Sequence, residues 1–149
     1  MNLPDEGILR RLIAFFAALG IGIAAYIAIA EAGGDAPACI VGSGGCKTVA
    51  ESSYSHLAGV NIAVFGVVGY ALLLASSFFA NDAARFGGFL ISLSGFGYSV
   101  FLTYLEIFKI EAICQWCVGS AIVMTILLLL NATRLIGYAG EEEGLSRAG

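Results

Sequence analysis

Residues 114–130 read CQWCVGSAIVMTILLLL, a Cys-x-x-Cys pair that runs straight into an apolar stretch. From Val118 to Leu130 the stretch carries no charged residue. A helix needs about 20 predominantly apolar residues to cross the hydrocarbon core of a bilayer, and residues 113–136 meet that length. The sequence therefore predicts a dithiol at the mouth of a membrane helix.

The composition of the whole chain indicates an integral membrane protein. Of its 149 residues, 59% are hydrophobic and 12% are charged, whereas a soluble domain has about 25% charged residues. The mean hydropathy is +0.91. The net charge of −4 comes largely from Glu141, Glu142 and Glu143. No basic patch is present, so we expect a lipid bilayer as partner and no nucleic acid.

Four apolar segments predict an all-α fold, a single membrane domain (1–149) built as an antiparallel bundle of four transmembrane helices. A long loop follows the first helix, with a short surface helix expected in its second half, from Cys46 to Leu57. A signal peptide is the alternative for the first segment, but that segment exceeds the usual apolar core of about 7–15 residues. The predicted segments are helices at 12–30, 62–80, 86–108 and 113–136, a loop at 31–61 and a charged tail at 137–149.

The distribution of Lys and Arg predicts the orientation, because basic residues are enriched in cytoplasmic loops. The side that holds both termini carries Arg10, Arg11, Arg85, Arg134 and Arg147, and the other side carries Lys47 and Lys109. We therefore expect both termini to lie in the cytoplasm. The protein itself is expected in the inner or plasma membrane of the cell. All four cysteines then lie on the extracytoplasmic side, where disulfides form and persist.

Cys114 and Cys117 have the spacing of a redox pair. Residues three apart on a helix share a face, so their sulfurs can form a disulfide. The positive end of the helix dipole stabilises a thiolate, which makes a better nucleophile and leaving group. The alternatives for this pair are a permanent structural disulfide and half of a metal site.

Cys39 and Cys46 lie seven residues apart in a glycine-rich loop. A flexible dithiol beside a helix-anchored dithiol suits disulfide exchange, in which a thiolate attacks a disulfide. Four cysteines allow three pairings, and the residues alone do not choose among them. A four-thiolate zinc site is one alternative, although such sites usually use tighter Cys-x2–4-Cys spacings, and two inert disulfides are another. We expect no metal.

Electrons that leave Cys114 and Cys117 need an acceptor in the membrane. A lipid-soluble quinone fits, since it takes two electrons and diffuses in the bilayer. The aromatic residues nearby, Trp116 among them, also fit the ordinary interfacial belt of membrane proteins. Glu106 is interpreted as an interfacial carboxylate, with proton transfer as the alternative.

Several motifs together resemble the vitamin K epoxide reductase family, in particular its short microbial members. Residues 46–54, CKTVAESSY, resemble the family pattern Cys-x-x-Val-x-x-Ser-x-Tyr. Gly59 and the pair Phe65-Gly66 follow at the expected distances, and residues 114–117 fit the active-site motif. The resemblance covers most of the chain, including the four predicted spans.

The resemblance implies a role for each cysteine. Cys114 and Cys117 would be the active-site pair, with Cys117 nearest the quinone ring. Cys39 and Cys46 would be a shuttle pair, in which Cys39 exchanges with an outside thioredoxin-like protein and Cys46 with Cys114. Ser52 matches a loop serine that supports the active site.

The resemblance also implies a quinone pocket, with ubiquinone, menaquinone or a related quinone as electron acceptor. Two positions depart from the animal members, which have a tyrosine at 121 and a head-group-binding asparagine at 62. These departures favour quinone reduction over epoxide reduction. The residues expected around the quinone are Val49, Asn61, Ile62, Phe65, Val118 and Ala121.

The predicted function is that of a membrane thiol:quinone oxidoreductase that promotes disulfide formation in exported proteins. Some microbial members carry a fused thioredoxin-like domain. This chain ends at Gly149, so we expect a separate thioredoxin-like thiol oxidase as partner. The alternatives are a non-catalytic membrane scaffold with structural disulfides and an enzyme whose main activity is vitamin K epoxide or quinone reduction. The unrelated four-helix disulfide-bond oxidase of bacteria has the two cysteine pairs in the opposite order.

Overall fold

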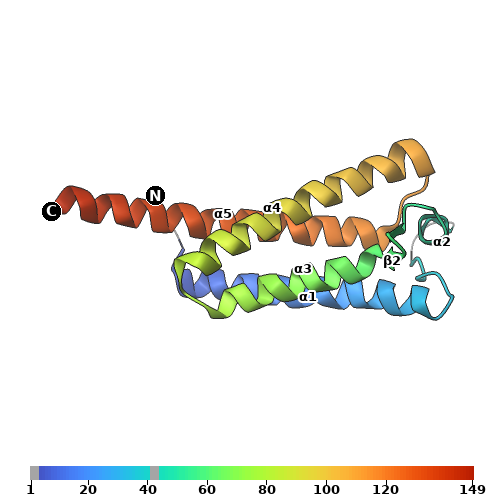
Figure 1. Ribbon diagram of the computed structural model, residues 1–149, viewed down its shortest axis with the longest axis horizontal. Coiled ribbons are helices and arrows are strands. Elements are labelled where there is room, and N and C mark those ends of the chain that lie inside the picture. The colour runs from blue at the N-terminus through green and yellow to red at the C-terminus, as the bar shows by residue number, and fades with distance from the viewer. Residues whose placement is uncertain (1–3, 41–43) are drawn as a thin grey trace.

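The computed structural model describes residues 4–40 and 44–149, which are mostly helical (Figure 1). A two-stranded hairpin, absent from the predicted all-α fold, lies in the loop after the first helix. The helices are α1 (Glu6–Ala32), α2 (Gly45–Ala50), α3 (Ile62–Phe78), α4 (Asp82–Leu105), the π-helical turn η1 (Glu106–Ile110) and α5 (Gln115–Ala148), and the strands are β1 (His56–Leu57) and β2 (Val60–Asn61).

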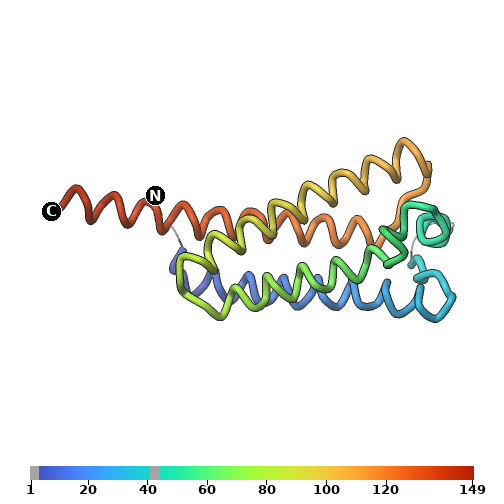
Figure 2. The backbone as a smooth tube through the Cα atoms, viewed as in Figure 1, coloured from blue at the N-terminus to red at the C-terminus, as the bar shows by residue number. Residues whose placement is uncertain are grey.

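Within the described residues, three helices are long and apolar enough to cross a membrane: α1, α4 continued through η1, and α5. The fourth apolar helix, α3, has 17 residues, which at 1.5 Å per residue gives a length of about 25 Å. It runs alongside α1 over most of its length (Figures 1 and 2). A crossing by α3 stays a prediction.

The helix bounds differ from the predicted ones mainly at the ends of the chain. The segment predicted as a charged tail at 137–149 continues α5 as far as Ala148, and Figure 2 shows this end projecting beyond the other helices. Glutamate is a good helix former, and the Tyr138 hydroxyl donates to Glu142 one turn later at 2.9 Å.

The predicted surface helix from Cys46 to Leu57 is wrong in extent. Helix α2 ends at Ala50, and strands β1 and β2 pair with His56 opposite Asn61. Ala58 and Gly59 connect them with φ angles of 53° and 82°. Two successive residues with positive φ are typical of a type I′ hairpin turn, and such a turn cannot continue a helix.

Asparagine caps fix the starts of two helices. The Asn61 side-chain oxygen accepts from the Ala63 backbone N–H at 2.7 Å at the start of α3. The Asn81 oxygen accepts from the Ala84 N–H at 3.0 Å at the start of α4. Both use an N–H that has no partner inside the helix. The short link over residues 79–81 makes α3 and α4 antiparallel neighbours.

Arginine side chains close the opposite end of α3, where the last carbonyls lack partners within the helix. Arg134 of α5, only 3% exposed, donates to the Phe79 carbonyl at 2.6 Å and pairs with Glu6 at 3.3 Å. Arg10 of α1 donates to the Ser77 carbonyl at 2.6 Å. These contacts tie α1 and α5 to the end of α3.

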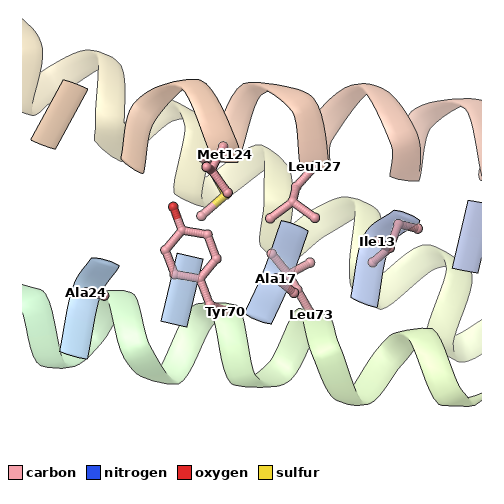
Figure 3. Packing of buried hydrophobic residues seen from close by; sticks show 8 residues of the cluster. Ile13, Ala17, Ala24, Tyr70, Leu73, Met124 and Leu127 are labelled. Carbon is pink, nitrogen blue, oxygen red and sulfur yellow. The ribbon is translucent and has the colours of Figure 1, made fainter. Parts of the chain in front are cut away.

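Tyr70 of α3 lies at the centre of the core and contacts two other helices (Figure 3). Its ring packs against Gly20 of α1, where an added methyl group would overlap it. Its hydroxyl donates to the Ser120 carbonyl of α5 at 2.9 Å. The buried cluster comprises Ile13, Ala17, Ala24, Tyr70, Leu73, Val123, Met124 and Leu127.

We expect Gly20→Ala to destabilise the bundle, because its methyl group must displace the buried Tyr70 ring. Overpacking of this kind costs about 1–3 kcal/mol. Gly22→Ala on the same helix is the matched control, since nothing lies within 4 Å of the methyl group it would add. Thermal unfolding of both variants in detergent tests this. Equal melting temperatures for the two variants would contradict the packing described.

Candidate active site

Cys114 and Cys117 occupy the start of α5. The helix begins at Gln115, two residues later than the predicted start at Ile113, so Cys114 is its N-cap. The Cys114 sulfur accepts from the Cys117 N–H at 3.4 Å. Both thiols are free, and Cys114 is 2% exposed. The cap position aims the Cys114 sulfur at the positive end of the helix.

The pKa of Cys114 lies below its ordinary value. The main cause is a hydrogen bond from the Cys117 thiol, and the backbone N–H groups of Cys117 and Trp116 act in the same direction. Burial and the charge of Glu106 oppose the shift. A thiolate is the reactive form in disulfide exchange, so Cys114 is the better nucleophile on this ground.

Cys39 and Cys46 form a disulfide, with their Cα atoms 5.9 Å apart. Cys46 is 1% exposed, whereas Cys39 is partly exposed. Because these two sulfurs are bonded to each other, four thiolates are not available to a zinc ion in this state. The Cys39–Cys46 pair, which we call the outer pair, is therefore oxidised. The Cys114–Cys117 pair, which we call the inner pair, is reduced.

The chain segments that carry the two pairs are in direct contact. An added methyl group at Gly45 would overlap the carbonyl oxygen of Ile113. Gly45 immediately precedes Cys46, and Ile113 immediately precedes Cys114. The absence of a side chain at Gly45 therefore allows the outer disulfide to lie close to the inner pair.

The two residues between the inner cysteines hold the loop on either side of Cys39. The Trp116 indole N–H donates to the Ala38 carbonyl at 2.9 Å, and the Gln115 side-chain oxygen accepts from the Ile40 N–H at 3.2 Å. Tyr26 stacks on Trp116, with ring centroids 4.9 Å apart. Trp116 thus has a structural contact beyond that of an interfacial aromatic residue.

A cavity of about 590 Å³ lies between α3 and α4, and its wall includes Cys117. Ligand pockets in proteins measure about 300–1,000 Å³. The end of the cavity next to the loop carries polar groups, among them Glu31, Ser52 and Ser55. The remainder of the wall is largely apolar. The lining residues Phe65 and Leu90 are 49% and 44% exposed, so the cavity is open to the surface of the bundle beside them.

The residues expected around a quinone separate into two groups. Val118 and Ala121 are not among the cavity-lining residues. Val118 directly follows Cys117 and is rotated from it by about 100° on α5, whereas Ala121, four residues on, lies about 40° from Cys117 and still does not line the cavity. The predicted residues that do line the cavity are Val49, Ser52, Asn61, Ile62, Phe65 and Cys117.

Two polar residues of the cavity wall have internal partners. Ser52 donates to the Val49 carbonyl at 2.7 Å and so supports the end of α2. Asn61 donates from its side-chain nitrogen to the Glu31 carboxylate, while its oxygen caps α3. Glu31 and Asn61 together join the end of α1 to the start of α3.

Glu106, interpreted from the sequence as an interfacial carboxylate, lies beside the Cys114–Cys117 pair. It is 4% exposed. Its carboxylate accepts from the Cys114 N–H at 3.2 Å and hydrogen-bonds the Cys117 thiol. The signal in the sequence is a carboxylate inside the predicted span at 86–108, since ionisable residues within membrane segments are costly and often functional.

Comparison with known proteins agrees with this geometry. The model of the vitamin K epoxide reductase family matches residues 11–132. The chain belongs to the vitamin K epoxide reductase family. No curated protein matches the chain. The matched region contains both cysteine pairs and the whole cavity wall, and membership of a family that uses quinones indicates a membrane oxidoreductase.

We expect loss of the Cys117 thiol to raise the pKa of Cys114, because the hydrogen bond that stabilises its thiolate disappears. The thiolate of Cys114 then forms only at higher pH. Thiolate absorbance can be titrated in a Cys39→Ser/Cys46→Ser background with and without Cys117→Ala. If the first thiolate to form does so at the same pH in both proteins, Cys117 does not lower the pKa of Cys114.

We expect Trp116→Phe to loosen the loop around Cys39, because the ring remains but its N–H donor is lost. One hydrogen bond contributes about 0.5–1.5 kcal/mol, which corresponds to hydrogen exchange about two- to thirteenfold faster at residues 36–40. Tyr104→Phe, at an exposed aromatic residue of α4, serves as control. Unchanged exchange in Trp116→Phe would show that this bond does not hold the loop.

Proposed function

We propose that the protein is a membrane thiol:quinone oxidoreductase that reoxidises an extracytoplasmic thioredoxin-like protein and so promotes disulfide formation in exported proteins. The observation that carries the proposal is the position of Cys117, a free thiol on the wall of a largely apolar cavity beside the Cys39–Cys46 disulfide. One side of this thiol pair meets a protein disulfide, and the other meets a space suited to a lipid-soluble ligand.

The outer step takes place at Cys39. A thiolate of the reduced partner attacks the Cys39 sulfur, the Cys39–Cys46 bond breaks and a mixed disulfide forms. The second thiol of the partner then displaces Cys39, which leaves the partner oxidised and both loop cysteines reduced. The partial exposure of Cys39 supports this assignment, as does the burial of Cys46.

The relay step passes two electrons from the loop to the inner pair. The Cys46 thiolate attacks Cys114 in an oxidised Cys114–Cys117 pair, and Cys117 leaves as a thiol. Cys39 then attacks Cys46, which restores the loop disulfide and releases Cys114. The contact of Gly45 with Ile113 supports exchange between Cys46 and Cys114. The pairing in the structure, with Cys39–Cys46 oxidised and Cys114 and Cys117 reduced, matches the product expected of this step.

The final step oxidises the inner dithiol with a quinone as substrate. The head group would lie at the polar end of the cavity near Cys117, and an isoprenoid tail would follow the apolar wall between α3 and α4. Cys114 and Cys117 form a disulfide, while two electrons and two protons convert the quinone to a hydroquinone. Val49, Asn61, Ile62 and Phe65 are the wall residues proposed to contact it.

We also propose that α1, α3, α4 and α5 all cross the membrane as one domain, with both chain ends cytoplasmic. The asymmetry of Lys and Arg supports this orientation. The buried arginine contacts lie at the end of the bundle opposite the cysteines, and both thiol pairs then face an oxidising compartment.

We expect Cys114→Ala and Cys117→Ala to abolish quinone-dependent reoxidation of a reduced thioredoxin-like protein, because each removes one sulfur of the disulfide that quinone reduction must form. Ubiquinone and menaquinone absorbance report the reaction. Cys39→Ala is the control: it should fail with the protein donor but retain quinone reduction with dithiothreitol, which reduces the inner pair directly. If the wild-type protein consumes neither quinone, the scaffold alternative is favoured instead.

A further inference from the structure

We propose that Glu106 is a catalytic acid–base group that takes the proton of the Cys117 thiol and delivers it to the quinone; this rests on the proposed function. Glu106 is the first residue of the π-helical turn η1. Such turns occur frequently at functional sites. Its carboxylate touches the Cys117 thiol and lines the same cavity.

The position of Glu106 matches the path that a proton must take. Oxidation of two thiols releases two electrons and two protons, and reduction of a quinone to a hydroquinone consumes the same number. Cys117 gives its proton to the Glu106 carboxylate as its sulfur loses electrons, and Cys114 closes the S–S bond as a thiolate. Glu106 then protonates a quinone oxygen. Water at the polar end of the cavity supplies the second proton, which replaces the one lost when Cys114 ionised.

Other titratable groups are less well placed for this step. On the cavity wall, Glu31 of α1 is paired with Asn61, and Tyr70 of α3 is paired with Ser120. Tyr54 of the loop and Tyr98 of α4 also line the wall. Lys109 and Glu111, the charged neighbours of Glu106 along the chain, are exposed. Among these groups, Glu106 is the one that hydrogen-bonds the Cys117 thiol.

A purely structural role is the competing explanation, because Glu106 accepts the Cys114 N–H and so supports the start of α5. Glu106→Gln separates the two roles. The glutamine oxygen can still accept that N–H with nearly the same side-chain shape, but an amide cannot take up and release a proton. Glu106→Asp retains an acid on a shorter side chain.

We expect Glu106→Gln to lower kcat for quinone reduction by about 100-fold, the lower range for loss of a general acid–base group. Its rate should also lose the pH dependence that the carboxylate gives to the wild-type protein. Exchange of the reduced partner with the oxidised protein, measured without quinone, should be unchanged. Glu106→Asp should recover part of the rate and the pH dependence. Glu111→Gln, at the exposed neighbouring carboxylate, is the matched control.

Infrared difference spectra of the quinone-free protein give a readout independent of turnover. Reduction of the Cys114–Cys117 disulfide should produce a carboxyl band that Glu106→Gln removes and Glu111→Gln keeps. Wild-type kcat and pH profile in Glu106→Gln would overturn the inference while leaving the proposed function intact. Equal loss of thiol exchange and thermal stability in Glu106→Gln would overturn it in favour of a structural role. A wild-type protein that reduces no quinone would refute the proposed function, and the inference with it.

Discussion

The contact of Tyr70 with Gly20 and Ser120 is the interaction on which the rest of the bundle depends. The Tyr70 ring fits among the helices only because Gly20 has no side chain. The Tyr70 hydroxyl hydrogen-bonds the backbone carbonyl and the side chain of Ser120. A buried hydroxyl needs such a partner, since leaving it without a hydrogen bond costs free energy. Ser120 lies one turn after Cys117, so the same contact positions the face of α5 that carries the thiol.

The two thiol pairs are brought together by contacts that do not involve the sulfur atoms. Gly45 lets one backbone approach Ile113, and Trp116 and Gln115 hold the loop on both sides of Cys39. The middle residues of the Cys-x-x-Cys motif therefore serve the partner disulfide as well as their own pair. These contacts keep the segment of the buried Cys46 near that of Cys114, while Cys39 stays partly exposed.

Much of the site was predictable, but the parts that depend on helix rotation were not. The dithiol at the start of α5 and the pairing of Cys39 with Cys46 agree with the sequence interpretation. Glu106 was interpreted as interfacial, because residue type and position along a span do not say which way a side chain faces. Val118 and Ala121 were placed near the quinone from the resemblance, but neither lines the cavity in the folded chain.

By itself the sequence determined that the chain is a helical membrane protein with two cysteine pairs, since apolar length and residue spacing are local properties. Only the tertiary structure decided that Glu106 touches Cys117, that Gly45 meets Ile113 and that a cavity opens beside the thiol. Those contacts join residues far apart in the chain, and their geometry depends on how closely and at what rotation the helices pack.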